Sequence, residues 1–127
     1  MKKAPNKFSR PRAEKVSEEM KAWAAALCSE LATWPQVDPR VFFGFTALYR
    51  KDTIFALLPR TRVLEPRNAI AFKLRFAGPR VLARARRDVR IGFTDMQETR
   101  WFTFALSAEA DLRDVLDWLQ RAYEASK

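Results

Sequence analysis

Two long stretches of the chain repeat their apolar residues at the spacing of an amphipathic helix. In the first stretch these residues are Met20, Trp23, Ala24, Leu27 and Leu31. We expect Ser17 to cap this helix, and Trp34-Pro35 to end it after about Thr33, because the residue before a proline avoids helical geometry. In the second stretch the apolar residues are Leu112, Val115, Leu116, Leu119, Ala122 and Tyr123, and Ser107 is the predicted cap.

The middle of the chain carries strand patterns. Residues 41–50 and 53–58 are rich in aromatic and branched side chains and predict a β-hairpin that turns at Lys51-Asp52. Gly44 lies inside the first of these segments, where a glycine indicates a bulge or a close approach of another backbone. Residues 90–93 and 101–106 predict two further strands.

Residues 70–76 alternate most regularly. Period two places Ile70, Phe72, Leu74 and Phe76 on the core face of a strand. The same alternation leaves Lys73 and Arg75 on the opposite face, which we expect to be wet. Residues 80–87 follow as a short arginine-rich helix, with Pro79 suited to its first turn.

The resulting order is helix, three strands, short helix, two strands, helix. It predicts a two-layer α+β fold in which the long helices cover one face of an antiparallel sheet of about five strands. We expect one domain over residues 17–126, preceded by a basic, disordered arm over residues 1–16. A chain of 127 residues with 48% hydrophobic residues is long and apolar enough for its own core.

The composition argues against several kinds of chemistry. Histidine is absent and Cys28 is the single cysteine, so we expect no metal site, no cofactor and no internal disulfide. Cys28 lies among alanines beside the first apolar stripe, which predicts a buried structural thiol. No export signal and no apolar run of membrane-spanning length is visible, so we expect a cytoplasmic protein without a membrane partner.

The net charge of +9 is concentrated in two segments. Residues 1–15 hold six cations against Glu14, and residues 60–90 hold ten against Glu65 and Asp88, so the rest of the chain is mildly acidic. A candidate anion-binding face comprises Arg60, Arg62, Lys73, Arg75, Arg80, Arg84, Arg87 and Arg90. Arginine suits phosphate contacts, although an ordinary solvated surface explains the same charges equally well.

Several strings resemble the TfoX N-terminal and MmcQ-YjbR-like group of small bacterial domains. Residues 43–57, with Phe-Gly, an aromatic strand and a short turn, are similar to that group's first hairpin. Phe72-Lys73-Leu74 resembles its third strand, and Trp101 with Ala122-Tyr123 resembles its closing part. The resemblance spans roughly residues 20–125 and implies the fold. It also implies a DNA-binding role through a double-wing shape.

We therefore expect a nonenzymatic binding domain with a basic face for an anionic partner, nucleic acid being the first candidate. The alternative is a protein-interaction or chaperone-like module that binds a partner or a second copy, which would expose Trp23, Trp34 or Phe42. Stacking on bases would use Phe42, Phe102 or Tyr49. No catalytic residue is assigned, but an acid–base pair remains open among Asp52, Asp88, Asp95 and Glu98.

Overall fold

A computed structural model describes residues 16–64, 68–75, 78–93 and 100–126. The first helix is α1 (Glu18–Leu31), and it is followed by β2 (Val37–Phe42), β3 (Phe45–Arg50), β4 (Thr53–Pro59) and β5 (Ala69–Lys73). The remaining elements are α2 (Pro79–Arg87), β6 (Ile91–Phe93), β7 (Trp101–Ala105) and α3 (Asp111–Ala125). The predicted α+β class is confirmed, with six strands in place of about five.

The additional strand arises because residues 41–50 form two strands and not one. Phe43 and Gly44 both have positive φ angles, 48° and 87°, and they make the tight turn between β2 and β3. Such a turn needs positive φ at both central positions, which glycine adopts at little cost. The predicted bulge at Gly44 is wrong, whereas the predicted close approach of another backbone is confirmed, since the N–H groups of residues 60–62 donate to the Gly44 carbonyl oxygen at 2.9–3.2 Å. A Cβ at Gly44 would also lie 2.7 Å from Arg62 Cγ.

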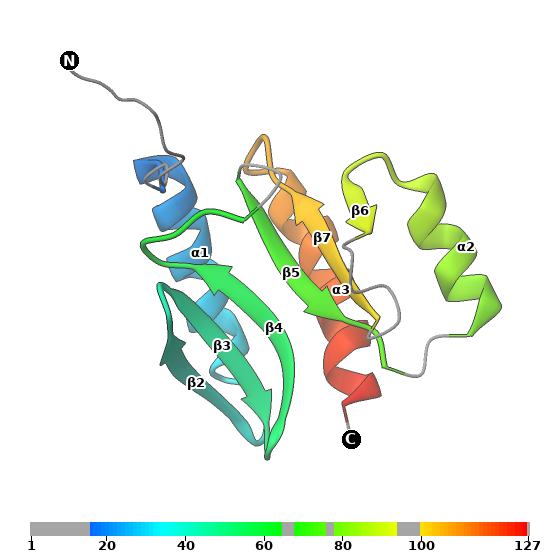
Figure 1. Ribbon diagram of the computed structural model, residues 1–127, viewed down its shortest axis with the longest axis horizontal. Coiled ribbons are helices and arrows are strands. Elements are labelled where there is room, and N and C mark those ends of the chain that lie inside the picture. Colours follow the sequence, from blue (N-terminus) through cyan, green and yellow to red (C-terminus); the bar gives the residue numbers. More distant parts are fainter. Residues whose placement is uncertain (1–15, 65–67, 76–77, 94–99, 127) are drawn as a thin grey trace.

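The six strands form one antiparallel sheet in the order β2-β3-β4-β5-β7-β6. The central pairing has the shortest register, because β4 and β5 share only the pairs Ala56–Phe72 and Leu57–Ala71. A bulge falls between β3 and β4, where Leu48 pairs with Ala56 and Tyr49 pairs with Ile54, so that Phe55 is the additional residue. Consistent with the short register of β4 and β5, Figure 1 shows these two strands separating toward the loop that follows β4.

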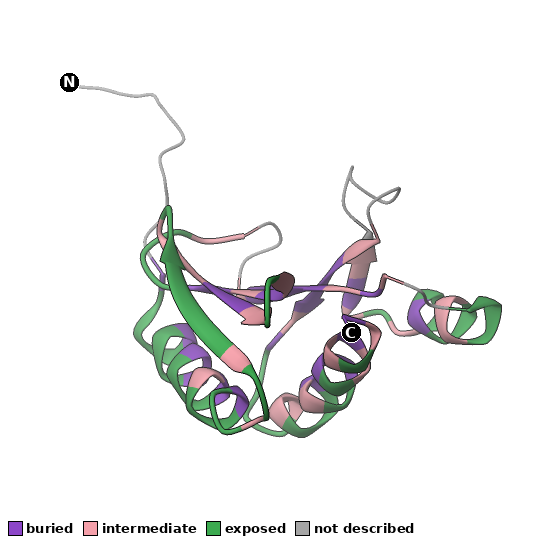
Figure 2. Ribbon diagram, turned by 90° about the horizontal axis from the view of Figure 1, so that it is seen from below, coloured by how far each residue is buried: buried purple, intermediate pink, exposed green. Residues whose placement is uncertain are grey.

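The two long helices lie side by side on one face of the sheet, as Figure 2 shows. Their stripes pack onto buried strand residues, and the largest fully buried side chains are Phe55, Phe72, Phe104, Met20, Leu27 and Leu31. Phe72 lies between Phe102 and Trp118, with ring centroids 5.8 and 5.9 Å away. The predicted core residues Ile70, Phe72 and Leu74 are buried, while Phe76 lies outside the described residues.

The helix ends test the capping predictions. Ser17 caps α1 as expected, because its Oγ accepts a hydrogen bond from the Met20 N–H at 3.0 Å, and α1 ends two residues before Thr33. The predicted Ser107 cap of the last helix is wrong, since α3 begins only at Asp111. Asp111 itself accepts hydrogen bonds from the Ser107 and Ala108 N–H groups, at 2.8 and 3.1 Å.

Among the described residues, no helix has the length and apolar character needed to cross a bilayer. The predicted arm over residues 1–16 falls almost entirely outside the described part of the chain. Val16, its last residue, is buried in the core.

Candidate nucleic-acid interface

The short helix α2 carries the densest positive charge. Its nine residues include four exposed arginines and no acidic residue: Arg80, Arg84, Arg86 and Arg87. It forms a helix because Pro79 occupies its first turn and because Val81, Leu82 and the buried Ala85 give it an apolar side that packs on the core. The arginine side therefore faces water next to β6.

Two of these arginines, Arg80 and Arg87, form no hydrogen bond, ion pair or ring contact within the described part of the chain. Arg84 is different, since its guanidinium carbon lies 5.9 Å from the centre of the Trp118 ring. Arg80 and Arg87 are thus the side chains of α2 whose guanidinium groups are most open to an external anion.

Lys73 and Arg75 lie at the end of β5 that leads toward α2. The alternation of β5 places the Lys73 side chain opposite the buried Phe72, on the face that α1 and α3 leave uncovered. Lys73 is half-buried, and its Nζ lies 5.9 Å from the centre of the Trp101 ring on β7. The prediction that Lys73 leaves the core face is confirmed.

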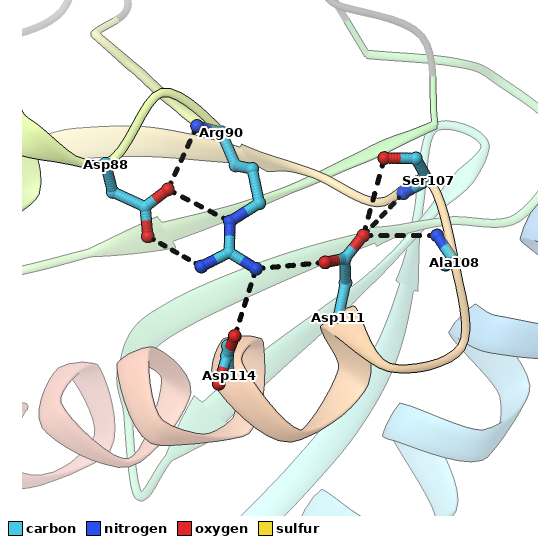
Figure 3. A network of polar contacts seen from close by, with 6 residues as sticks. All are labelled: Asp88, Arg90, Ser107, Ala108, Asp111 and Asp114. Carbon is cyan, nitrogen blue, oxygen red and sulfur yellow. Dashed lines mark hydrogen bonds and ion pairs between the residues drawn. The ribbon is translucent and has the colours of Figure 1, made fainter.

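Arg90 stands apart from the other candidates, because its guanidinium is already bound to carboxylates. It bonds Asp88 Oδ2 at 2.9 Å, Asp111 Oδ1 at 2.9 Å and Asp114 Oδ2 at 3.0 Å, as Figure 3 shows. The group also lies 4.7 Å from the centre of the Phe104 ring. Arg90 joins the turn after α2 to the first turn of α3, so its role is to hold elements together.

Two of the carboxylates around Arg90, those of Asp88 and Asp111, have lowered pKa values. The hydrogen bond from Arg90 lowers the pKa of Asp88, and the Ser107 backbone N–H, followed by Arg90, lowers the pKa of Asp111. A carboxylate with a lowered pKa is a weak base at neutral pH. Of the proposed acid–base set, Asp52 is exposed at the β3–β4 turn, and Asp95 and Glu98 lie outside the described residues.

Arg60 and Arg62 directly follow β4 and lie beside the β2–β3 turn, in the half of the sheet away from α2. The backbone N–H groups of Arg60, Thr61 and Arg62 donate to the Gly44 carbonyl oxygen at 3.0, 2.9 and 3.2 Å. This contact fixes both arginines next to the β2–β3 turn, where both are exposed. Neither arginine forms an ion pair with the described residues.

The eight candidate cations therefore do not form one compact patch. Arg60 and Arg62 lie near β2 and β3, whereas α2 contacts β6, the last strand at the opposite edge. Five strand spacings of about 4.8 Å separate these edges, which gives about 24 Å. Lys73, Arg75 and the α2 arginines form one group, and Arg60 with Arg62 forms a second.

Charge nevertheless segregates by layer. The helices α1 and α3 together hold seven acidic and three basic residues, a net charge of −4. The described residues between them, 32–110, hold thirteen basic and four acidic residues, a net charge of +9. An anion would thus meet an unfavourable helical layer and a favourable sheet and α2.

Three aromatic predictions have different outcomes. Phe42 is 45% exposed, Tyr49 is half-buried beneath the Arg40 guanidinium at 4.3 Å, and Phe102 is buried. A stacking role for Phe102 is therefore excluded by burial. The pattern missed Phe43, which is 76% exposed. The Phe43-Gly44 pair could have predicted this exposure, because a tight turn at these two residues leaves the Phe43 side chain outside the sheet.

Cys28 is only half-buried, so the prediction of a buried thiol is wrong in degree. The Cys28 side chain lines a depression of about 330 Å³ between α1 and the ends of β3 and β4. It is not fully buried because it lies beside the apolar stripe of α1 and not within it. Partial burial raises the pKa of the thiol, which leaves little thiolate at neutral pH. In the described residues, no three histidine, cysteine or acidic side chains gather as metal ligands would.

Comparison with known proteins gave no match to any protein-family model, and none among curated proteins or solved structures. The likeness to the TfoX and YjbR group accordingly stays a prediction.

Proposed function

We propose that this protein is a nonenzymatic binding domain for a polyanion, that the polyanion is nucleic acid, and that α2 makes the main contact. The observation that carries the proposal is the run of four exposed arginines in nine residues without an acidic neighbour on the helix. Arginine presents several donors in a fixed fork, which matches two phosphate oxygens at once.

Lys73 and Arg75 extend this surface from the end of β5, and Arg60 with Arg62 provides a separate contact beside the β2–β3 turn. Arg90 is left out of the proposed interface because three carboxylates already bind its guanidinium. Neither group presents a pattern that would read a base sequence, so binding is expected to depend on charge more than on sequence.

Binding to mixed-sequence DNA and RNA oligonucleotides at 50 and 200 mM salt tests this function. With four phosphate contacts to a single strand, affinity should fall roughly 50-fold over this range, because each neutralised phosphate releases part of a counterion. An absence of binding at 50 mM salt would contradict the proposal.

The double variant Arg80→Glu/Arg87→Glu should bind at least tenfold more weakly at low salt, while its unfolding midpoint stays unchanged. Both side chains are exposed and form no hydrogen bond or ion pair with the described residues. The matched control Lys21→Glu/Arg113→Glu changes the net charge equally, but on the acidic helical layer. Equal losses in both double variants would mean that only net charge matters and that α2 is not the contact surface.

A protein-interaction role is the second candidate, and the exposed apolar residues Val41, Phe42 and Phe43 favour it. Trp23 is buried and Trp34 is half-buried, so these two do not contribute to such a surface. Sedimentation equilibrium at several concentrations tests the homodimer form of this role. Such a dimer should dissociate in the variant Phe43→Ser, and a monomer at all concentrations would contradict it.

A further inference from the structure

The face of the sheet opposite α1 and α3 is open among the described elements. One row of residues crosses all six strands on this face, because the register places each beside the next. The row reads Arg40, Ala47, Leu57, Ala71, Thr103 and Gly92. Arg40 is exposed and Leu57 and Gly92 are half-buried, whereas Ala47, Ala71 and Thr103 are buried. The row is therefore the packed base of this face, and larger neighbouring side chains provide its accessible surface.

Cations lie against aromatic rings on both halves of this open face. On one half, the Arg40 guanidinium covers the Tyr49 ring at 4.3 Å while it bonds Asp38 at 2.9 Å. On the other half, Lys73 lies 5.9 Å from the centre of the Trp101 ring. Flat rings interleaved with cations on an uncovered sheet are the arrangement that single-stranded nucleic acid uses for stacking and phosphate contact.

The β2–β3 turn adds an exposed aromatic pair at the β2 end of this face. Phe43 is 76% exposed and Phe42 is 45% exposed, with ring centroids 4.8 Å apart at 63°. Figure 2 shows β2 rising from the level of the helices to the opposite side of the sheet, so this turn stands on the open side. The contact of residues 60–62 with Gly44 places Arg60 and Arg62 beside it.

We infer that a single strand of nucleic acid lies across the open face, from Phe43 and Phe42 at the β2–β3 turn to the arginines of α2. The two rings stack on unpaired bases, and Arg60 and Arg62 contact the neighbouring phosphates. The inference rests on the proposed function and adds a preference for single strands to it.

The dimensions of the sheet fit this path. The edges are about 24 Å apart, and stacked nucleotides advance about 3.4 Å each, so the face spans about seven nucleotides. Domains that bind single strands on a sheet commonly cover about 4–16 nucleotides. The charge distribution favours the same face, since the acidic residues of α1 and α3 lie on the other side.

A single strand is favoured over a duplex because only unpaired bases expose their flat faces to Phe43 and Phe42. The α2 arginines would serve either form, as they contact phosphates alone. The two groups of residues therefore make separable contributions, and variants of one group should change strand preference while variants of the other should not.

The experiment compares a 12-nucleotide unstructured single strand with a duplex of the same sequence at 50 mM salt. The double variant Phe42→Ala/Phe43→Ala should bind the single strand roughly fivefold to 100-fold more weakly, as expected for lost stacking, and the duplex within twofold of the unmodified protein. Phe43→Trp should retain or raise single-strand affinity. Val89→Ala is the matched control, since Val89 is an exposed apolar residue in the turn between α2 and β6.

Four results would overturn the inference. Unchanged single-strand binding by Phe42→Ala/Phe43→Ala, with weakened binding by Arg80→Glu/Arg87→Glu, would remove the stacking site and leave the proposed function intact. Loss of a dimer in the phenylalanine variant without a change in binding would assign the turn to a protein partner. No binding of either oligonucleotide by the unmodified protein would remove both proposals. If the alanine variant does not fold, a tenfold loss of affinity in Phe43→Trp also contradicts stacking.

Discussion

The two edges of the sheet use arginine in opposite ways. At the β6 edge, Arg90 is enclosed by three carboxylates and fixes the chain after α2 to α3. At the β2 edge, Arg60 and Arg62 have exposed side chains, and it is their backbone that makes the contact, with Gly44. At one edge the arginine charge is paired within the fold, and at the other it is exposed to solvent.

This difference shows that the number of arginines in a segment does not tell how many of them are exposed and unpaired in the fold. Arg87 and Arg90 are three residues apart, yet the first is exposed and forms no ion pair within the described structure, while the second is bound by three acidic groups. Two of those groups, Asp111 and Asp114, are more than twenty residues away in sequence. The fold decides which cations remain free.

The largest expected effect tests the anchoring role at the β6 edge. Arg90→Ala should lower the free energy of unfolding by about 2–3 kcal/mol, because it strands the half-buried carboxylates Asp88 and Asp111 and removes a contact with Phe104. Denaturant unfolding followed by tryptophan fluorescence measures this loss.

Arg113→Ala is the control for that experiment, since Arg113 is exposed on α3 and forms no ion pair with the described residues. Its unfolding free energy should change by less than about 0.5 kcal/mol. If both variants lose the same amount, the carboxylate network around Arg90 does not anchor the edge.

Much of the fold followed from the sequence because local patterns dictated it. The stripe of α1 and the turn at Lys51-Asp52 each involve residues close together in sequence, and both are present. Lys73 leaves the core face of β5 as expected, but the expectation of a wet face is wrong for the rest of this strand, since Ala69 and Ala71 are buried like Ile70 and Phe72. The Phe43-Gly44 turn was missed because the apolar run continues through it. Helix α3 starts late because Asp111 bonds the preceding loop, a contact that no periodicity reveals.

The candidate site was less predictable for the same reason. The α2 arginines were found because helical spacing places them on one side. The separation of Arg60 and Arg62 from α2 depends on strand order, and β4 and β5 are joined by a connection whose path the pattern does not specify. The role of Arg90 depends on carboxylates brought from α3 by the tertiary fold.

A second prediction concerns the β2 edge. Gly44→Ala should lower the free energy of unfolding by about 1–2 kcal/mol, because φ is +87° there and the new methyl group would meet Arg62 Cγ at 2.7 Å. Chemical denaturation measures the loss. Gly78→Ala is the matched control: nothing lies within 4 Å of its Cβ position, and its φ of −81° suits any residue. A smaller loss for Gly44→Ala than for Gly78→Ala would contradict the tight turn.

The smallest expected effect is a pH dependence confined to the β6 edge. The folded-state pKa values of Asp88 and Asp111 are lowered, by Arg90 for Asp88 and first by the Ser107 N–H for Asp111. A group with a lowered folded-state pKa stabilises the protein above its unfolded pKa of about 3.9 and ceases to do so as pH falls through the folded value. Stability should therefore drop below about pH 4.

Asp111→Asn isolates this contribution. At pH 7 the variant should be less stable by about 1 kcal/mol, because the amide keeps one acceptor oxygen but loses the charge that faces Arg90. As pH falls below about 4, Asp111 in the unmodified protein becomes neutral as well, so the two unfolding free energies should converge. Parallel denaturation curves from pH 2 to pH 7 measure the difference. A constant gap across this range would mean that the charge of Asp111 contributes nothing to the edge, and that its bonds to the Ser107 and Ala108 N–H groups carry its whole effect.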